Sequence, residues 1–323
     1  MCAAVMFGAI PAQAEPITTA ILIAAGTAAV SWLTPKALDK LSENDIKVIK
    51  QNALNGDFQA MYNMGLIYYL GKNVERSYPE AIRWWFKAAK EHNYAQAQYS
   101  LGGLYYNGEG VIQNYPEAFS WYKKAAEQGH PQAQNILGLM YQNGLGVSQN
   151  YNEAIKWFTK SAEQGFIEAQ NNLGLMYIDV MGAEYYKEAV KWFAKAAEKD
   201  NAEAEYHLGL MYYIGDGVSL DQFQAAMLLH RAAQQGHVLA QYNLAMMYFM
   251  GKGVGRDYKS AFEWFSKAAE NGDASSQYIL GFMCQNGYSL EKNREEAIKW
   301  YREAAKNGNE QAQEELKELG EVW

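Results

Sequence analysis

The sequence predicts an all-α fold, a right-handed α-solenoid of about seven helix-turn-helix repeats. Three observations support this prediction: one block of sequence recurs along the chain, both halves of the block have helical periodicity, and glycines stand where each helix must end. One position of the block lies 35 to 37 residues from its next copy, at Trp84, Trp121, Trp157, Trp192, Leu228, Trp264 and Trp300. A fixed period of this length is typical of stacked helical pairs.

The first half of the block predicts a helix that approaches its neighbour closely. In the clearest copy, Ala97, Leu101 and Tyr105 recur every four residues and share one face. Gly102 follows Leu101, although glycine inside a helix costs about 1 kcal/mol relative to alanine. Since a small residue returns at this position in every copy, we expect close contact between this backbone and the next helix. The equivalents are Gly65, Gly138, Gly174, Gly209, Ala245 and Gly281.

The second half of the block predicts an amphipathic helix. Its apolar residues follow the i, i+3, i+4, i+7, i+8 spacing of one buried stripe. In the same copy these are Ala118, Trp121, Tyr122, Ala125 and Ala126. We expect the recurring tryptophan to fill the junction between adjacent pairs. Lysines of this helix, such as Lys160 and Lys195, are expected on the solvated face.

Glycines predict where the helices end. Gly108 and Gly110 lie where the first helix must stop and the chain must reverse, a role suited to a residue that tolerates positive φ. Gly129 is placed in the same way after the second helix. Four copies depart from the pattern. The first has Gly71-Lys-Asn-Val74 in its turn, and the seventh has Cys284 at the tyrosine position and Gly287-Tyr-Ser in its turn. The fourth reads Tyr177–Gly182 without the double glycine, and the fifth has two leucines in place of the aromatic pair.

These motifs resemble those of the Sel-one-like repeat family, relatives of the tetratricopeptide repeats with a longer turn. The resemblance rests on Leu-Gly-x-x-Tyr in the first helix, Gly-x-Gly-Val in the turn, and Ala-x-x-Trp-Tyr/Phe-x-Lys-Ala-Ala-Glu-x-Gly in the second helix. It implies seven repeats over 57–309. We expect them at 57–93, 94–129, 130–165, 166–200, 201–236, 237–272 and 273–309.

Both ends of the chain lie outside the repeats. Residues 1–14 have the apolar stretch and the Ala12-Gln13-Ala14 ending of a signal peptide, so we expect export to the periplasm or secretion. Residues 15–56 are expected to form an apolar and capping helical segment. Within it, the uncharged run 17–34 is just long enough to span a bilayer, which leaves membrane anchoring as the alternative. The glutamate-rich segment 310–323 suits a C-terminal capping helix.

Composition and motifs argue against several classes of function. The formal net charge of −8 disfavours nucleic acid, which attracts a basic surface. Cys2 and Cys284 are the two cysteines, and we expect no disulfide, no metal and no cofactor. The histidines have no metal-ligand spacing, and no pattern pairs a nucleophile with a base. The sequence therefore predicts a protein that is not an enzyme, although some members of the family are described as hydrolases of β-lactams.

Resemblance to tetratricopeptide repeats implies that the first helices line a concave groove that holds a protein or peptide. Tyrosine suits such a surface because it offers a large contact area at a small cost in entropy. The alternative is that some of these tyrosines pack between neighbouring first helices. The predicted binding residues are Tyr62, Tyr69, Tyr99, Tyr106, Asn135, Asn171, Tyr206, Tyr213, Tyr242, Phe249, Tyr278 and Phe282.

The sequence and the resemblance together favour an exported bacterial adaptor that binds a protein partner. Some periplasmic members of the family resemble immunity proteins that neutralise a secreted toxin, often a lipase, and this is the alternative function. An envelope scaffold and a binder of host factors also remain open, because the repeat pattern specifies the fold and not the partner.

Overall fold

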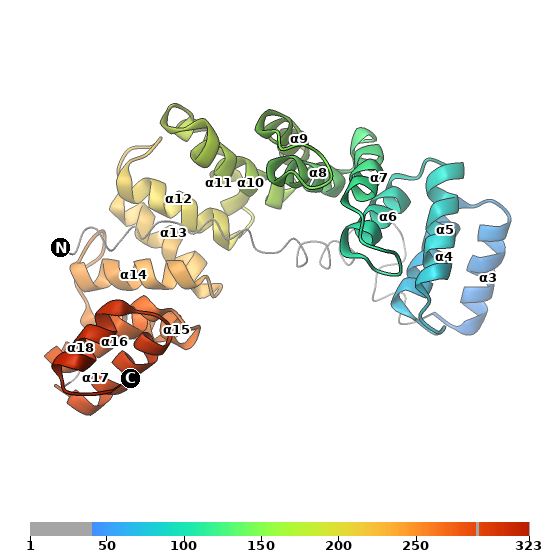
Figure 1. The fold of residues 1–323 in the computed structure, drawn as a ribbon. Coiled ribbons are helices and arrows are strands. Elements are labelled where there is room, and N and C mark those ends of the chain that lie inside the picture. Colours follow the sequence, from blue (N-terminus) through green and yellow to red (C-terminus); the bar gives the residue numbers. More distant parts are fainter. Residues whose placement is uncertain (1–40, 289–290, 323) are drawn as a thin grey trace. The chain divides into compact units, whose positions relative to one another are not determined.

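The computed structural model describes residues 41–288 and 291–322, in which every regular element is a helix and none is a strand (Figure 1). After α3 (Glu43–Leu54) the helices come in pairs, which we call helix A and helix B of each repeat. The A helices are α4 (Phe58–Leu70), α6 (Ala95–Asn107), α8 (Pro131–Asn143), α10 (Ile167–Met176), α12 (Ala202–Ile214), α14 (Val238–Met250) and α16 (Ala274–Asn286). The B helices are α5 (Tyr78–Glu91), α7 (Tyr115–Glu127), α9 (Tyr151–Glu163), α11 (Tyr186–Ala197), α13 (Gln222–Gln234), α15 (Tyr258–Glu270) and α17 (Arg294–Lys306). The predicted all-α repeat fold is confirmed.

The described helices belong to two compact units, and the chain passes from one unit to the other within α10. One unit ends at Gln170 and the other begins at Asn171. The first unit therefore contains α3 and the first three repeats. The second contains repeats 5 to 7 and the last helix, α18 (Glu310–Glu318), which buries Ala312 and Leu316.

Within a repeat, helix A and helix B meet at the recurring glycine. The aromatic residue that follows the recurring tryptophan fills the space above this glycine, as Tyr122 does at Gly102 and Tyr301 does at Gly281. In repeat 1 the indole of Trp85 takes this place, and its Nε1 donates a hydrogen bond to the carbonyl oxygen of Tyr62 (3.0 Å). The predicted close approach is therefore between the two helices of one repeat.

The recurring tryptophan packs in the other direction, against the preceding repeat. Trp121 belongs to the same core cluster as the residues of repeat 1, and its ring lies edge-on to Phe86 of α5, with 5.9 Å between centroids. Trp264 meets His230 of α13 in the same way at 5.4 Å. A lysine ammonium group lies over the face of the indole, as Nζ of Lys267 does at 3.8 Å from the centre of the Trp264 ring. The tryptophan therefore lies at the junction between pairs, as the sequence predicts.

Each turn between helix A and helix B also joins two repeats. Gly108 ends α6 in the left-handed conformation, with φ 75°. Gly110 has φ 71°, and its backbone lies so close to Tyr78 at the start of α5 that a side chain would collide with it. In repeat 1 this second position holds Asn73, whose φ is 54° and whose Nδ2 donates a hydrogen bond to the carbonyl oxygen of Leu41 (2.6 Å).

Repeat 4 is irregular where its turn lacks the double glycine. A π-helical segment, Tyr177–Met181, extends α10, and a 3-10 turn, Ala183–Tyr185, precedes α11. Gly182 between them has φ 86°. The missing residue thus changes the path of the turn while both helices of the repeat are kept.

None of the helices in the described part of the chain is both long and apolar enough to cross a membrane. The predicted signal peptide, 1–14, and the uncharged run 17–34 lie outside the described residues, and so does most of the segment 15–56.

Candidate protein-binding surface

The predicted groove residues lie two before, two after and five after the residue that precedes the recurring small residue of helix A, and we call these the first, second and third groove positions. They differ in how accessible they are. The side chain at the first groove position is buried in six repeats, where it packs between helices beneath the exposed surface. These residues are Tyr62, Tyr99, Asn135, Asn171, Tyr206 and Tyr242, and Tyr106 at the third position is buried as well. Partly exposed groove residues are Tyr69, Tyr213, Phe249, Tyr278 and Phe282. A partner that contacts helix A would meet mainly this second set.

Four partly exposed aromatic rings gather in repeats 6 and 7. Measured between ring centroids, Phe249 of α14 lies 5.2 Å from Tyr258 at the start of α15 and 5.5 Å from Tyr288 in the turn after α16. Tyr288 also contacts Tyr258 at 4.8 Å and stacks on Phe282 of α16 at 5.8 Å. We call these four residues the aromatic cluster. Partly exposed aromatic residues are enriched at protein interfaces because they combine area with few rotatable bonds.

Sequence reasoning identified Phe249 and Phe282 in this cluster but not Tyr258 and Tyr288. The sequence does contain a pattern that could have indicated Tyr258. A tyrosine begins helix B in several repeats, and its ring contacts the residue at the third groove position of the same repeat. The other ring pairs of this kind are Tyr69 with Tyr78 at 5.7 Å and Tyr106 with Tyr115 at 5.1 Å. Tyr288 has no such counterpart, because the turn of repeat 7 departs from the Gly-x-Gly-Val pattern.

In the first unit, the A helices of repeats 1 and 2 enclose a small cleft of about 40 Å³. Its walls include groove residues from all three positions, among them Tyr62, Tyr69 and Tyr99. At one end the hydroxyl of Tyr69 donates a hydrogen bond to Oε2 of Glu109 (2.7 Å), and Nδ2 of Asn107 donates to Oε1 of the same carboxylate (2.9 Å). Burial, together with this contact to Glu109, raises the pKa of Tyr69. Tyr69 therefore remains a neutral hydrogen-bond donor.

A buried amide on helix A joins successive repeats. Nε2 of Gln134 in α8 donates a hydrogen bond to the carbonyl oxygen of Ala126 in α7 (3.0 Å). Gln164, which follows α9, donates from Nε2 to Oε1 of Gln134 (2.7 Å). These bonds hold the A helices in place beneath the surface. The equivalent amides on other A helices are Gln98, Gln170, Gln241 and Gln277, and the partly buried Gln313 of α18 forms the same bond to Ala305.

Repeat 5 replaces this amide with a carboxylate and compensates for the change. Glu205 is fully buried and accepts a hydrogen bond from Nε2 of Gln235 (2.8 Å), while the guanidinium of Arg231 pairs with its other oxygen. Nη2 of Arg231 donates to the carbonyl oxygen of Ala197 (2.8 Å), the atom that a glutamine would have satisfied. Burial raises the pKa of Glu205, and the charge of Arg231 opposes this effect.

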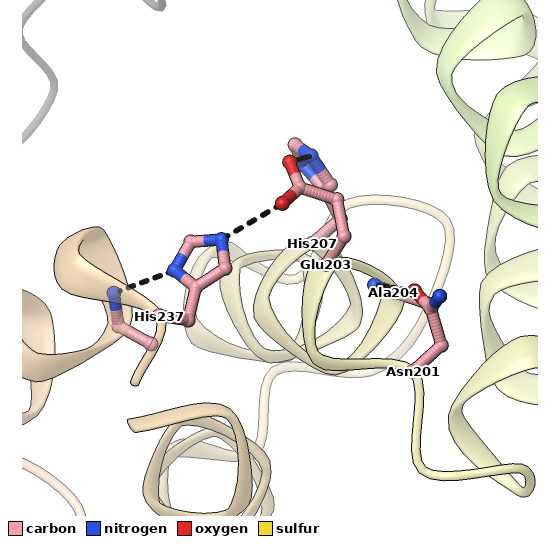
Figure 2. A network of polar contacts seen from close by, with 6 residues as sticks. Asn201, Glu203, Ala204, His207 and His237 are labelled. Atoms are coloured by element: carbon pink, nitrogen blue, oxygen red, sulfur yellow. Dashed lines mark hydrogen bonds and ion pairs between the residues drawn. The ribbon is translucent and has the colours of Figure 1, made fainter. Parts of the chain in front are cut away.

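A second polar contact links repeats 5 and 6 (Figure 2). Glu203, in the first turn of α12, lies between two histidines, with Oε1 at 3.2 Å from Nε2 of His207 and Oε2 at 3.0 Å from Nε2 of His237. Nδ1 of His237 accepts a hydrogen bond from the backbone N–H of Ala240 (3.1 Å), so the proton of the neutral ring is on Nε2 and faces Glu203. Hydrogen bonds from His207 and His237 hold the pKa of Glu203 well below its usual range.

These polar contacts serve packing, and they do not resemble a catalytic centre. Across the described ranges, no group of three or more His, Cys, Asp or Glu side chains is placed to hold a metal ion. Cys284 is buried, and burial raises the pKa of its thiol, so it remains protonated and unreactive.

Helical pairs that stack through a periodic core define an α-helical repeat protein. The chain belongs to the Sel1 repeat family, because the model of the Sel1 repeat matches seven successive segments of it. They cover residues 58–93, 95–130, 131–166, 167–201, 202–237, 238–273 and 274–309. Members of this family typically mediate protein interactions and are usually non-catalytic.

Several solved structures are similar to this chain. A protective antigen present in uropathogenic Escherichia coli strains, which displays this repeat fold, is 38% identical over 85% of this chain, with a TM-score of 0.81. The chain spans 59% of the length of that antigen. A Sel1 repeat protein from Oxalobacter formigenes is 31% identical over 98% of this chain and 92% of its own, with a TM-score of 0.71. No curated protein matches the chain.

A third similarity is more distant. An immunity protein from Pseudomonas aeruginosa is 19% identical over 67% of this chain and 83% of its own, with a TM-score of 0.41. At this distance the similarity carries no argument about function.

Proposed function

We propose that this chain is a non-enzymatic adaptor that binds a protein or peptide on the exposed surface of its A helices. The observation that carries the proposal is the aromatic cluster of Phe249, Tyr258, Phe282 and Tyr288, in which rings from two repeats meet and remain partly exposed. Aromatic anchors of this kind commonly account for most of the energy of a protein interface.

Support also comes from the way the A helices are held. Hydrogen bonds from buried amide side chains join A helices to the preceding repeat, and the glycine contacts join them to helix B of the same repeat. A surface built on such helices is rigid before a partner arrives. Little conformational entropy is then lost on binding, which increases affinity.

We further propose that the mature protein is exported and begins at Glu15. This rests on the Ala12-Gln13-Ala14 ending of residues 1–14, which lie outside the described part of the chain. Amino-terminal sequencing of protein made with its native upstream region tests the proposal. An intact chain recovered from the cytosol would refute it.

Affinity capture from the native host tests the binding proposal. The double variant Phe249→Ala, Phe282→Ala removes two rings that are only partly buried, so the helices should remain folded. Loss of two anchors is expected to weaken binding by about 100-fold or more. Tyr206 and Tyr242 are unsuitable for this test because they are buried, at 6% and 7% exposure, and their loss would disturb the core.

The matched control is Phe223→Ala, which removes a ring of the same kind that is 59% exposed on helix B of repeat 5. We expect wild type and this control to capture the same partner and the double variant to lose it. If the double variant captured the partner as well as wild type did, the aromatic cluster would not be the interface. Should the captured protein be a toxin, the adaptor would be an immunity protein.

A further inference from the structure

The cleft between the A helices of repeats 1 and 2 contains a carboxylate without a cation. Glu109 accepts hydrogen bonds from two neutral groups, the hydroxyl of Tyr69 and the amide of Asn107. No described lysine, arginine or histidine forms an ion pair with it. The guanidinium of Arg76 lies 5.8 Å from the centre of the Tyr69 ring, but it donates its Nε proton to the carbonyl oxygen of Tyr69 (3.0 Å).

Oxygen atoms of other lining residues also lack partners. The hydroxyls of Tyr99 and Tyr122 form no hydrogen bond within the described structure, and neither does Oδ1 of Asn107. Tyr99 is 4% exposed and Tyr122 is fully buried. Burial raises the pKa of Tyr122, and the negative charge of Glu109 adds to this effect. A buried oxygen without a donor costs roughly 1 to 3 kcal/mol, so a ligand that brings N–H donors would be favoured here.

The remaining walls of the cleft are apolar and aromatic. They include Leu66, Leu104 and the rings of Tyr62, Tyr69 and Trp85. Trp85 already donates its Nε1 proton to the carbonyl oxygen of Tyr62, so the indole offers its ring and not its N–H. Aromatic faces attract a positive charge, most strongly where water is excluded. The volume of about 40 Å³ has room for roughly three water molecules, or for the end of one side chain.

We propose that this cleft receives the side chain of a lysine from the protein partner. The methylene stem lies against Leu66 and the aromatic walls, and the ammonium group binds the carboxylate of Glu109. Lysine fits because its ammonium group is compact and carries three donors, whereas arginine presents a broad planar fork. The proposal rests on the proposed function, since it names the chemistry by which a protein partner is recognised at the A helices.

Other repeats of the chain do not combine these features. The turn position of Glu109 is occupied by Leu145 in repeat 3, Lys252 in repeat 6 and Tyr288 in repeat 7. Repeat 5 has Asp216 at this turn position. The residue of the preceding repeat that is equivalent to Tyr69 is Ile178, which has no hydroxyl to donate. Asp216 is therefore a matched control, a carboxylate in the same turn without the tyrosine donor.

Short synthetic peptides test the lysine site on the full chain. The probes are blocked alanine pentapeptides whose central residue is lysine, norleucine, arginine or glutamate. Norleucine keeps the apolar stem of lysine and lacks the ammonium group. Binding is followed by the NMR signals of the Leu66 and Leu104 methyl groups at peptide concentrations up to roughly 10 mM. We expect the lysine peptide to shift both signals and the norleucine peptide to bind roughly tenfold more weakly or worse.

Two variants complete the test. Glu109→Gln keeps the shape of the side chain and should reduce the preference for lysine over norleucine to less than about twofold. Asp216→Asn should leave that preference unchanged. Equal binding of lysine and norleucine, unchanged lysine binding by Glu109→Gln, or no methyl shift with the lysine peptide would each overturn the proposal. Stronger binding of the arginine peptide would overturn the choice of lysine. These results leave the capture experiment on the aromatic cluster unaffected, so failure of the two proposals can be told apart.

Discussion

The ring of Phe158 occupies the space in which a side chain at Gly138 would begin. A Cβ atom built on Gly138 would lie 2.6 Å from both Cδ1 and Cε1 of this ring, closer than real Cβ contacts. The glycine is therefore required by the partner helix and not by its own backbone, which is helical. A side chain of helix B in the same repeat fills this space, which explains why glycine, a residue unfavourable to helices, recurs in helix A.

Gly138→Ala should lower the free energy of unfolding by about 1 to 3 kcal/mol, because overpacking outweighs the better helix propensity of alanine. Urea unfolding measures the change. Gly209→Ala is the matched control, since the nearest atom there is Cγ of Leu229 at 3.1 Å, and a flexible leucine can move. Equal losses of stability in the two variants would show that the Phe158 ring is not the reason why residue 138 must be glycine.

Trp157→Ala should destabilise the protein by about 3 to 5 kcal/mol, the usual cost of truncating a buried tryptophan. The residue is 6% exposed and packs in the same core cluster as Ile136 and Met140. Because each repeat contacts mainly its neighbours, the loss should be local. Hydrogen exchange should therefore rise first in repeats 2 and 3. A uniform rise over all repeats would contradict a fold stabilised by contacts between neighbours.

Arg231→Ala should destabilise strongly at neutral pH, by about 3 kcal/mol or more, because it leaves the buried carboxylate of Glu205 without a cation. The pKa of Glu205 is already raised by burial. A raised carboxyl pKa favours the fold below the pKa of the unfolded chain, and this stability is lost as the pH rises through the folded pKa. The deficit of the variant should therefore shrink on acidification.

Adding Glu205→Gln to Arg231→Ala provides the control for this interpretation. A glutamine could donate to the carbonyl oxygen of Ala197, as Gln134 does to Ala126. The double variant should recover most of the lost stability and lose the pH dependence. If the double variant were as unstable as Arg231→Ala, the uncompensated charge would not be the cause.

His130 should make stability depend on pH below neutrality. Its Nδ1 accepts a hydrogen bond from the backbone N–H of Ala133 (3.2 Å), and burial lowers its pKa from 6.5 to about 4. The unfolded chain therefore binds a proton more readily between these values. Stability should be complete above pH 6.5 and should fall by at most about 3 kcal/mol as the pH decreases to 4.

His130→Asn keeps a side-chain acceptor at the start of α8, since asparagine caps helices well and does so at Asn201 and Asn309. Unfolding measured at pH 7.5 and pH 5 should show a smaller difference for this variant than for wild type. An equal difference would mean that other groups cause the pH dependence.

Sequence periodicity was sufficient to predict the helices, the glycine turns and the small residue at each helix contact. It was less informative about the surface. Tyr99 and Tyr206 have the spacing of groove residues, yet they are buried because neighbouring helices cover them. The spacing of residues specifies the face of a helix but not how much of that face a neighbour covers. Tyr288 and Glu109 lie in turns, where no helical period applies, so their contacts needed the structure.

Site-specific photo-crosslinking in the native host tests most directly whether the A helices bind the partner. A photoreactive phenylalanine analogue is placed at Phe282 in the aromatic cluster and, in a second variant, at Phe223, which is 59% exposed on helix B of repeat 5. We expect a discrete cross-linked partner from position 282 and none from position 223. A partner cross-linked from position 223 and not from position 282 would contradict this expectation.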